Sequence, residues 1–497
     1  MSAKNAEEFD VVVVGGGPGG STLASLVAMQ GSRVLVLEKE SFPRYQIGES
    51  LLPSTIHGIC RLTGASEALS QAGFTLKRGG TFRWGSSERP WTFEFAVSPR
   101  MAGPTSFAYQ VERSKFDKIL LDNARRVGAQ VREMCPAMGV IDDNERVRGV
   151  RYLDGNGSER VAFSEFIVDA SGNKSQIYQA VGGQRKYSEF FRGLALFGYF
   201  EGGKRLTEPN AGNIYCAAFD SGWFWYIPLS SSLTSVGAVV RHEMVSKVQG
   251  EPEKALMGLI KECPAIDELL SSAKRVTVGD YGQLRVRKDY SYHNSAFWRP
   301  GMLLVGDAAC FVDPVFSSGV HLATYGALLA ARSVNSVLAG LVSEKAAMRE
   351  FEDRYRHEYG TFYEFLLAFY ELHVDENSYF WQAKKVTNSS RCDLEAFVDL
   401  VGGISSGEAA LTDAASAATR LRSGSAELAS AIRDRASGSS MAPVYEASVV
   451  QRALAESSQI QLRAAISNYA GPTTPLFEDG LVASADGMFW LDPRQQG

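Results

Sequence analysis

A glycine-rich turn after the first apolar run constrains the fold more than any other feature of the sequence. In "VVVVGGGPGGSTLA", Gly15, Gly17 and Gly20 have G-x-G-x-x-G spacing between a continuous apolar run and a helical pattern. Gly15 permits the tight turn, Gly17 lets the backbone approach a pyrophosphate, and Gly20 allows close helix-to-strand packing. A helix N-terminus placed here favours phosphate charge. The pattern predicts a strand–helix–strand unit that binds a dinucleotide.

An acidic residue closes the second strand of this unit. "RVLVLEK" reads as a buried parallel strand, and Glu38 stands at its end. A carboxylate there accepts hydrogen bonds from ribose hydroxyls and repels a 2′-phosphate. Glu38 therefore favours FAD or NAD over NADP.

Composition excludes several other classes of function. The 497 residues, 45% of them hydrophobic, suffice for two to three structural units. Lys and Arg number 51 against 56 Asp and Glu, with no basic block, so we expect no nucleic-acid or membrane partner. The 6 Cys form no CxxC pair, which predicts neither a metal site nor a disulfide framework and fits a reducing cytoplasm. The N-terminus does not resemble a signal peptide, and no apolar run approaches transmembrane length, so we expect a soluble cytoplasmic protein.

The later segments change from parallel to antiparallel character. Residues 81–97 and 194–241 alternate as antiparallel strands do, whereas 316–340 and 345–372 read as two long helices. Beyond residue 400 an Ala/Ser/Gly-rich stretch predicts loosely packed helix or linker, followed by a tail that docks onto the body. The class is α/β (α+β), a nucleotide-binding domain interrupted by a β-rich one.

The hexapeptide "WFWYIP" at 223–228 is the most aromatic stretch of the chain. Alternation along a strand places Trp223, Trp225 and Ile227 on one face and Phe224 and Tyr226 on the other. The two Trp residues are either ordinary packing of a β-domain core or a wall with a chemical role. The two interpretations are compatible.

Two further stretches indicate which cofactor binds. "FIVDASGNKS" and "GMLLVGDAACFVDPVFSSGVHLA" each run from an apolar strand through a polar turn into a helix. This resembles the FAD-binding pattern of the aromatic-hydroxylase superfamily, in which the "GD" positions, here Gly306 and Asp307, bind FAD. Arg44 and Arg113 match other positions at which that superfamily holds the cofactor. An isolated "GD" is otherwise a turn, and an isolated Arg a surface charge.

The resemblance implies a Rossmann-like FAD-binding domain, an inserted antiparallel β-sheet domain for substrate and a mostly helical C-terminal region. The FAD-binding domain would comprise residues 1–80, 113–185 and 291–345, the β-rich segments 81–112 and 186–290, and the helical region 346–497.

The combination of "FPRYQIGESLLP", "GFTLKRGG", "WFWYIP" and "DPVFSSGVHLA" resembles the flavin-dependent halogenases over most of the chain. It is most similar to the halogenases of glycopeptide antibiotic assembly, of the vancomycin, balhimycin and teicoplanin type. That branch chlorinates phenol rings of tyrosine-like residues carried by a peptidyl carrier protein. Reduced FAD and dioxygen convert chloride to hypochlorous acid, which must reach the substrate without meeting bulk water.

The resemblance assigns roles to residues outside the cofactor motifs. Halide would bind at Ser318 and Gly319, where a helix N-terminus favours an anion; a plain N-cap by a serine is the structural alternative. Lys77 would hydrogen-bond hypochlorous acid or form a chloramine, a role closed to the neighbouring Arg78, whose guanidinium stays protonated. Trp223 and Trp225 would separate flavin from substrate.

One position departs from part of the family. Tryptophan halogenases have a glutamate where this chain has Phe316, which fits a phenol substrate because the phenol oxygen itself activates the ring. The residue that takes the ring proton is left open. Glu49, in "GES", is expected against the flavin in a structural role, and His321 is either a base or a helix-packing residue.

The sequence thus predicts an FAD-dependent halogenase supplied with reduced flavin by a separate reductase, since no second nucleotide motif is present, and with a carrier-bound phenolic amino acid. An aromatic hydroxylase on the same scaffold is the nearest alternative. A geranylgeranyl-reductase-like flavoprotein and a binding protein that has lost its flavin are further ones.

Overall fold

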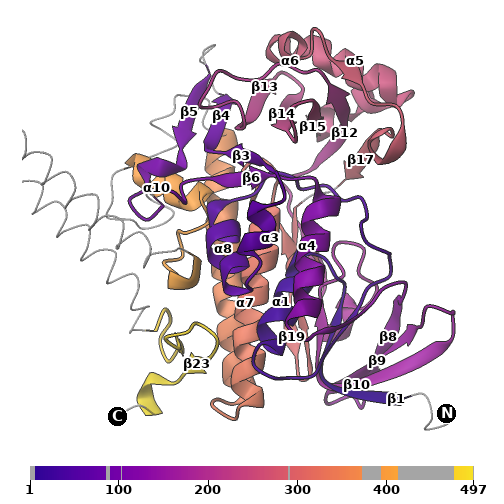
Figure 1. Cartoon of the computed structure of the whole chain (residues 1–497), viewed down its shortest axis with the longest axis vertical. Helices are drawn as coiled ribbons and strands as arrows, with labels where there is room; N and C mark the ends of the chain where they lie inside the picture. The colour runs from indigo at the N-terminus through magenta and orange to yellow at the C-terminus, as the bar shows by residue number, and fades with distance from the viewer. Residues whose placement is uncertain are drawn as a thin grey trace, which may run out of the picture.

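Figure 1 shows the chain as a lower body of sheet and long helices with a second β-sheet above it. The computed structural model describes residues 6–84, 90–101, 103–288, 291–371, 393–411 and 475–495. Among these residues, no helix combines the length and the apolar character that a membrane span needs.

The body is built on a mostly parallel sheet in the order β19-β20-β10-β1-β2-β7, with β9 and β8 continuing from β10. β1 lies between β10 and β2, and Val11–Val14 pair with both neighbours and are buried. The strands are β1 (Ala6–Val14), β2 (Val34–Leu37), β7 (Gln130–Arg132), β8 (Ala137–Asp142), β9 (Val147–Leu153), β10 (Glu159–Asp169), β19 (Trp298–Arg299) and β20 (Met302–Leu304). The continuous apolar runs are thus buried parallel strands, as the sequence predicts.

Long helices pack beside this sheet. They are α1 (Pro18–Ala28), α4 (Arg113–Arg126), α7 (Ser318–Leu338) and α8 (Glu344–Glu371). α1 and α7 approach closely at Gly19, where an added Cβ would lie 3.2 Å from the Ala323 carbonyl oxygen. Gly326 likewise makes room for Tyr355 between α7 and α8. The two long helices expected from the sequence are confirmed.

The upper domain is an antiparallel sheet to which both β-rich segments contribute. Its order is β16-β12-β15-β14-β13-β4-β5, with β17 also paired to β12. The strands are β4 (Gly79–Arg83), β5 (Trp91–Glu94), β12 (Gly193–Glu201), β13 (Ile214–Phe219), β14 (Gly222–Pro228), β15 (Leu233–Arg241), β16 (Lys274–Arg275) and β17 (Arg285–Lys288). β4 pairs in parallel with β13, which joins segments about 130 residues apart in the chain.

β14 has the alternation that its sequence predicts. Trp223, Trp225 and Ile227 belong to the large core shared with the body, whereas Phe224 and Tyr226 belong to a separate cluster. That second cluster lies under α5 (Pro252–Glu262) and α6 (Pro264–Leu269), which cover the sheet at the top of Figure 1. The Trp face therefore points toward the body.

Short elements join the two parts. They are the π-helix η2 (Ser54–Ile59), α2 (Cys60–Leu62), α3 (Ser66–Ser70), the pair β3 (Thr75–Lys77) and β6 (Ala108–Gln110), and the small sheet of β11 (Arg185–Tyr187), β18 (Tyr292–Asn294) and β21 (Cys310–Phe311).

The C-terminal tail docks onto α7, as expected. Trp490, in the hairpin of β22 (Val482–Ala483) and β23 (Trp490–Leu491), is fully buried. Its backbone N–H donates to Ser336 Oγ (2.7 Å) and its Nε1–H donates to Ser333 Oγ (2.8 Å). The helix α10 (Asp393–Val401) is described, but most of the expected Ala/Ser/Gly-rich linker falls at 412–474, outside the described residues.

Candidate active site

The glycine turn has the geometry that the motif predicts. Gly15 has φ +104°, and a Cβ there would lie 2.5 Å from the Ala170 carbonyl oxygen. A Cβ on Gly20 would lie 1.9 Å from the Gly15 oxygen, so neither position accepts a side chain. Gly17 is the residue before α1, and a Cβ on it would first meet the Arg44 guanidinium at 3.5 Å. Gly17 is thus the open side of the turn, where a pyrophosphate would approach.

Glu38 is buried beneath this turn. Its Oε2 accepts from the Gly16 N–H (2.7 Å) and its Oε1 accepts from the Glu40 N–H (2.9 Å). Each carboxylate oxygen can accept a further hydrogen bond, so ribose hydroxyls would add to this arrangement.

Two predicted cofactor arginines meet on one carboxylate that the sequence analysis missed. Arg113 binds Asp117 through Nε (2.7 Å) and Nη2 (2.9 Å), and Arg44 Nη1 donates to the same group at 2.9 Å. Arg113 also donates to the Ile47 carbonyl at 2.6 Å, which ties α4 to the "GES" loop. The i,i+4 spacing of Arg113 and Asp117 on a helix was the available sign.

The "GD" motif forms a tight turn before α7. Gly306 has φ +65° and donates its N–H to the Tyr355 hydroxyl at 3.1 Å. Burial raises the pKa of Asp307, and the positive charges of Arg113, Arg287 and Arg185 oppose that rise. Three guanidinium groups from separate elements therefore act electrostatically on one carboxylate, and only Arg113 was predicted from the sequence.

Glu49 is buried in the adjoining loop, where it meets the upper sheet. Its Oε1 accepts from the Tyr199 hydroxyl (2.7 Å), which is itself 2.7 Å from the Tyr45 hydroxyl. Its Oε2 makes no well-formed hydrogen bond within the described part of the chain. Burial raises the pKa of Glu49 to about 7. An orphaned buried carboxylate oxygen fits a ligand that would complete it.

Lys77 is buried although it ends a short strand. Its side chain is 2% exposed, and its Nζ donates to the Leu51 carbonyl (3.0 Å) and to Ser317 Oγ (3.4 Å). Burial lowers the pKa of Lys77 to about 7. Among the described side chains, no carboxylate lies within ion-pair distance of it. An unpaired buried ammonium is costly, and groups with strongly shifted pKa values cluster at functional sites.

The N-terminus of α7 lies directly beside this lysine. Ser317, in the left-handed conformation (φ 61°, ψ 23°), precedes the helix, and no described side chain caps it. Ser318 Oγ instead donates to the Asp313 carbonyl at 3.4 Å. A serine cap is thus not what satisfies the first turn, and its N–H groups and helix dipole favour an anion.

A small cavity adjoins both Lys77 and the start of α7. Its volume is about 10 Å³, enough for one water. Its lining residues are Lys77, Phe82, Phe93, Ile214, Val315, Phe316, Ser317 and Val401. Apart from Lys77 and Ser317 the wall is apolar, so a polar guest there would interact with those two side chains.

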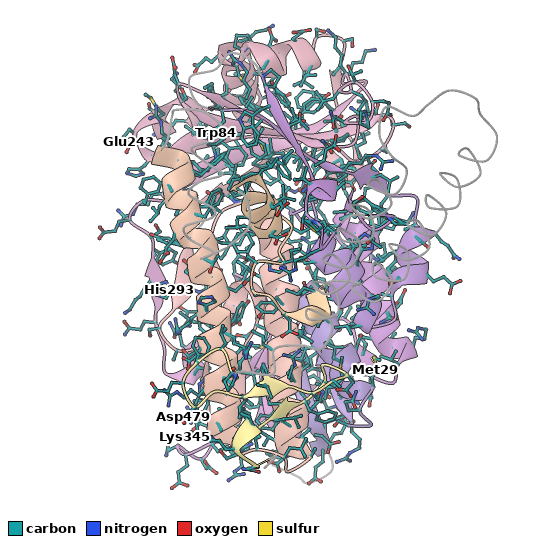
Figure 2. The ribbon with its side chains drawn as sticks, turned by 90° about the vertical axis from the view of Figure 1, so that its left-hand side faces the viewer. Met29, Trp84, Glu243, His293, Lys345 and Asp479 are labelled. Carbon is teal, nitrogen blue, oxygen red and sulfur yellow. The ribbon has the colours of Figure 1, made fainter. Side chains whose placement is uncertain are left out.

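The predicted Trp wall stands on the sheet face toward this region. Trp223 and Trp225 are 2% and 5% exposed, and their rings lie 6.2 Å apart. Trp225 Nε1 donates to Ser235 Oγ at 3.2 Å, whereas Trp223 Nε1 makes no well-formed hydrogen bond to any described residue. Trp84 packs 5.9 Å from Trp223, where the upper sheet meets the upper end of α8 (Figure 2).

His321 lies deeper in α7. Its Nε2 is 2.9 Å from Glu358 Oε1 and its Nδ1 is 3.0 Å from Ser54 Oγ, and it is fully buried between α7, α8 and η2. The geometry favours the packing role over that of a base at the cavity.

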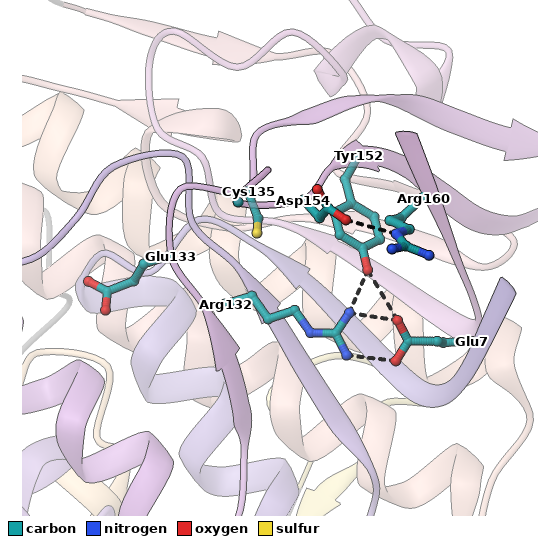
Figure 3. A pocket seen from close by; sticks show the side chains of 8 residues that line it. Glu7, Arg132, Glu133, Cys135, Tyr152, Asp154 and Arg160 are labelled. Atoms are coloured by element: carbon teal, nitrogen blue, oxygen red, sulfur yellow. Dashed lines mark hydrogen bonds and ion pairs between the residues drawn. The ribbon is translucent and has the colours of Figure 1, made fainter. Parts of the chain in front are cut away.

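A larger surface hollow lies elsewhere on the body (Figure 3). It measures about 530 Å³ and is lined by Glu7, Arg132, Glu133, Cys135, Tyr152, Asp154, Gly155 and Arg160. Arg132 binds Glu7 in bidentate fashion (2.7 and 2.6 Å), and Arg160 binds Asp154 at 2.9 Å. These charges satisfy one another, and none of the predicted site residues lines the hollow, so size alone does not identify the site.

The fold, with its glycine turn between β1 and α1, is that of a dinucleotide-binding protein. The glycine turn, the arginine cluster and the orphaned Glu49 oxygen fit the pyrophosphate and ring system of FAD. The chain matches the tryptophan halogenase family over residues 10–102 and 97–415, and it belongs to that family.

Individual relatives agree with this membership. The chain is 34% identical over 405 residues to a tryptophan 2-halogenase of Chondromyces crocatus, an alignment that covers 79% of this chain and 75% of that one. Its structure resembles that of a myxobacterial chondrochloren halogenase, which is FAD-dependent, with TM-score 0.74, 50% identity and coverage of 97% and 100%. A flavin-dependent brominase follows with TM-score 0.68, 28% identity and coverage of 80% and 94%.

The chain is therefore a flavin-dependent halogenase, an oxidoreductase that uses FAD and chloride, as the sequence predicts. The hydroxylase alternative is not favoured.

Proposed function

We propose that this halogenase chlorinates a phenol ring, ortho to its hydroxyl, in a tyrosine- or 4-hydroxyphenylglycine-type residue. The observation that carries the proposal is the apolar Phe316 beside Lys77, at the position where tryptophan halogenases have a glutamate. Phe316 is buried and packs against Phe369 (4.7 Å) and Phe365 (5.2 Å). A ring activated by its own hydroxyl has less need of a carboxylate at that point than an indole has.

The cofactor residues would be Gly15, Gly17, Gly20, Glu38, Arg44, Glu49, Arg113, Gly306 and Asp307. When bound, reduced FAD supplies, with dioxygen, the oxidising equivalents that convert chloride to hypochlorous acid. The chain's own part is to hold the pyrophosphate at Gly17 and Arg44, and to hold chloride at the uncapped first turn of α7, at Ser318 and Gly319.

Lys77 would position the oxidant. Its Nζ already donates toward Ser317 at the end of the small cavity, so hypochlorous acid there would replace or extend that hydrogen bond. The low pKa of Lys77 lets the group give up and regain a proton near neutral pH. The apolar lining excludes water, which preserves the oxidant for the substrate.

Trp223 and Trp225 would form the barrier between flavin and substrate. Both indoles are buried on the sheet face that points toward the body. A phenol kept away from the flavin meets only the smaller oxidant, so chlorination is favoured over hydroxylation.

The substrate would arrive on a peptidyl carrier protein, in glycopeptide-type antibiotic biosynthesis in the cytoplasm. A separate flavin reductase would supply reduced FAD, because the sequence has one dinucleotide motif. These points rest on the resemblance of the motifs that surround Lys77 and Trp223.

Mass spectrometry tests the proposal. The protein is incubated with reduced FAD, chloride, dioxygen and tyrosine. The tyrosine is supplied as the free amino acid, within a peptide, or attached to a carrier protein. We expect one hydrogen of the phenol replaced by chlorine, with its isotope pattern, and the highest rate for the carrier-bound form. Addition of oxygen without chlorine, or chlorination of tryptophan in preference to all phenols, would contradict the proposal.

A further inference from the structure

The loop that leads into α7 begins with a buried carboxylate to which no role has yet been assigned. Asp313 is 4% exposed, and its Oδ1 accepts from the Val315 N–H at 2.9 Å. The Tyr370 hydroxyl, from α8, lies 3.2 Å from both oxygens. Among the described residues no cation lies within ion-pair distance of Asp313. This contrasts with Asp117, which two arginines neutralise.

Asp313 directly precedes the chain segment that lines the small cavity beside Lys77. The residues that follow Asp313, namely Val315, Phe316 and Ser317, line the small cavity together with Lys77. Both charges also act on the Cys216 thiol of β13, whose pKa Lys77 lowers and Asp313 raises, while burial raises it most. The groups that face Asp313 are therefore Tyr370 from α8, Cys216 from β13 and the Val315 N–H of its own loop.

The carboxylate also adjoins the Trp wall. The Tyr370 hydroxyl is close enough to the Trp223 indole N–H for that group to lower its pKa, although burial keeps the pKa of Tyr370 well above its usual value. Tyr370 further packs 5.5 Å from Trp84. The pair of Asp313 and Tyr370 thus spans the space between the α7 turn and the wall.

We infer that the Asp313 carboxylate, oriented by the Tyr370 hydroxyl, is the base that takes up the ring proton displaced by chlorine. The inference rests on the proposed function, since it concerns the phenol ring that reacts with the oxidant positioned by Lys77. It assigns to Asp313 the task that the apolar Phe316 leaves vacant.

The step balances in atoms and charge. The C–Cl bond forms as the Cl–O bond of hypochlorous acid breaks, and the leaving oxygen takes a proton from the Lys77 ammonium and departs as water. The C–H electrons return to the ring as its proton passes to the Asp313 carboxylate. Asp313 is left neutral and Lys77 is left as an amine, and transfer of one proton between them restores both.

That return costs little free energy. Burial raises the pKa of Asp313 to about 7 and lowers that of Lys77 to about 7. Two groups with matched pKa values exchange a proton at little cost in free energy, and a base poised near neutral pH is efficient. Tyr370 is an orienting residue here, because it acts through Asp313.

Asp313→Asn tests the inference with a phenolic substrate deuterated ortho to its hydroxyl. The amide keeps the size and the Tyr370 hydrogen bond but accepts no proton, so we expect chlorination to fall by about 10²-fold or more. Proton removal then limits the rate, and the variant should show a primary isotope effect that the wild type lacks. The acid limb near pH 7 in the wild-type rate profile should also disappear. Tyr370→Phe should give a smaller loss with the limb retained.

Two controls separate a chemical role from a structural one. Release of hypochlorous acid, measured with a trap in the absence of phenol, should be unchanged in Asp313→Asn, and Glu358→Gln, which alters a buried acid away from the cavity, should chlorinate normally. Loss of trapped hypochlorous acid in parallel with chlorination, or a loss with no isotope effect, would overturn the inference. A chlorination rate of Asp313→Asn within about twofold of the wild-type rate would also overturn it, because a general base contributes a larger factor than that. If the wild type yields hypochlorous acid but chlorinates no phenol, the proposed function fails instead.

Discussion

The two faces of β14 are equally buried, yet they differ in chemistry. On the outer face, Phe224 and Tyr226 pack under α5 and α6, and the Tyr226 hydroxyl donates to the Lys204 carbonyl at 2.7 Å. On the inner face, the Trp223 indole N–H makes no well-formed hydrogen bond among the described residues, and the Tyr370 hydroxyl is a polar neighbour of it. Beyond it lie Lys77 and Asp313, each a buried charge with no ion-pair partner in the described part of the chain.

The difference shows that burial alone does not mark a site. An ordinary core satisfies its polar groups, because an unpaired buried donor or charge costs stability. The inner face retains several such groups within one region, which is expected where a ligand or a reaction completes them. Substitutions on the two faces should therefore fail in different ways.

The largest effect is expected at Lys77. Lys77→Ala should bind FAD and oxidise reduced flavin normally, but chlorination should fall by roughly 10³-fold or more, because no amine remains to position the oxidant. Chlorinated product is measured against flavin oxidation. Arg78→Ala, at the exposed neighbouring position, is the matched control and should chlorinate at the wild-type rate. Retained chlorination in Lys77→Ala would remove the lysine from the mechanism.

The Trp wall gives the sharpest contrast between the faces. Trp223→Ala and Trp225→Ala should yield hydroxylated phenol or uncoupled flavin oxidation, because substrate gains access to the flavin. Phe224→Ala, on the outer face, should lose about 3–5 kcal/mol of stability with the product ratio unchanged. Mass spectrometry identifies the products of each variant, and thermal unfolding measures its stability. If the Trp variants lose only stability, the inner face is ordinary core.

The pH dependence of stability tests the burial of Lys77 without any substrate. The folded-state pKa, near 7, lies below the unfolded value of 10.5, so the folded protein is the weaker proton binder between them. Wild-type stability should fall from pH 10 to 7 and change little below that. Lys77→Met lacks this contribution, so its free energy of unfolding near pH 6 should exceed that of the wild type by up to about 5 kcal/mol, about 1.4 kcal/mol for each unit by which the pKa of Lys77 is lowered. If the free energies of unfolding of the two proteins change with pH in parallel, Lys77 is solvated in the folded protein.

A smaller effect is expected at the halide turn. A Cβ on Gly319 would lie 3.0 Å from the Phe311 ring, so Gly319→Ala should shift the first turn of α7 slightly. We expect the KM for chloride to rise roughly tenfold, about 1.4 kcal/mol, with FAD affinity unchanged. Chloride titration at fixed flavin measures this. An unchanged KM would place the halide elsewhere.

The cofactor half of the site was largely predictable, because its requirements are local. Gly20 is required by its close approach to Gly15, and Gly15 by its positive φ, although the group that a Gly15 side chain would meet, the Ala170 carbonyl, lies far away in the chain. Glu38 follows its strand where the motif predicts. Asp117 could have been found from its spacing to Arg113. Arg185 and Arg287 could not, since their charges act on Asp307 only after three separate segments come together.

The sequence by itself determined the periodic elements, the glycine turn and which residues of "WFWYIP" share a face, since these follow from backbone sterics and from alternation along a strand. Only the tertiary structure decided that the Trp face points toward the body, and that Lys77 and Asp313 are buried without counter-charges. The physical reason is that desolvation and charge pairing depend on groups far apart in the chain, such as Lys77 with Ser317 and Asp313 with Tyr370. No local pattern reports whether such a charge has a partner.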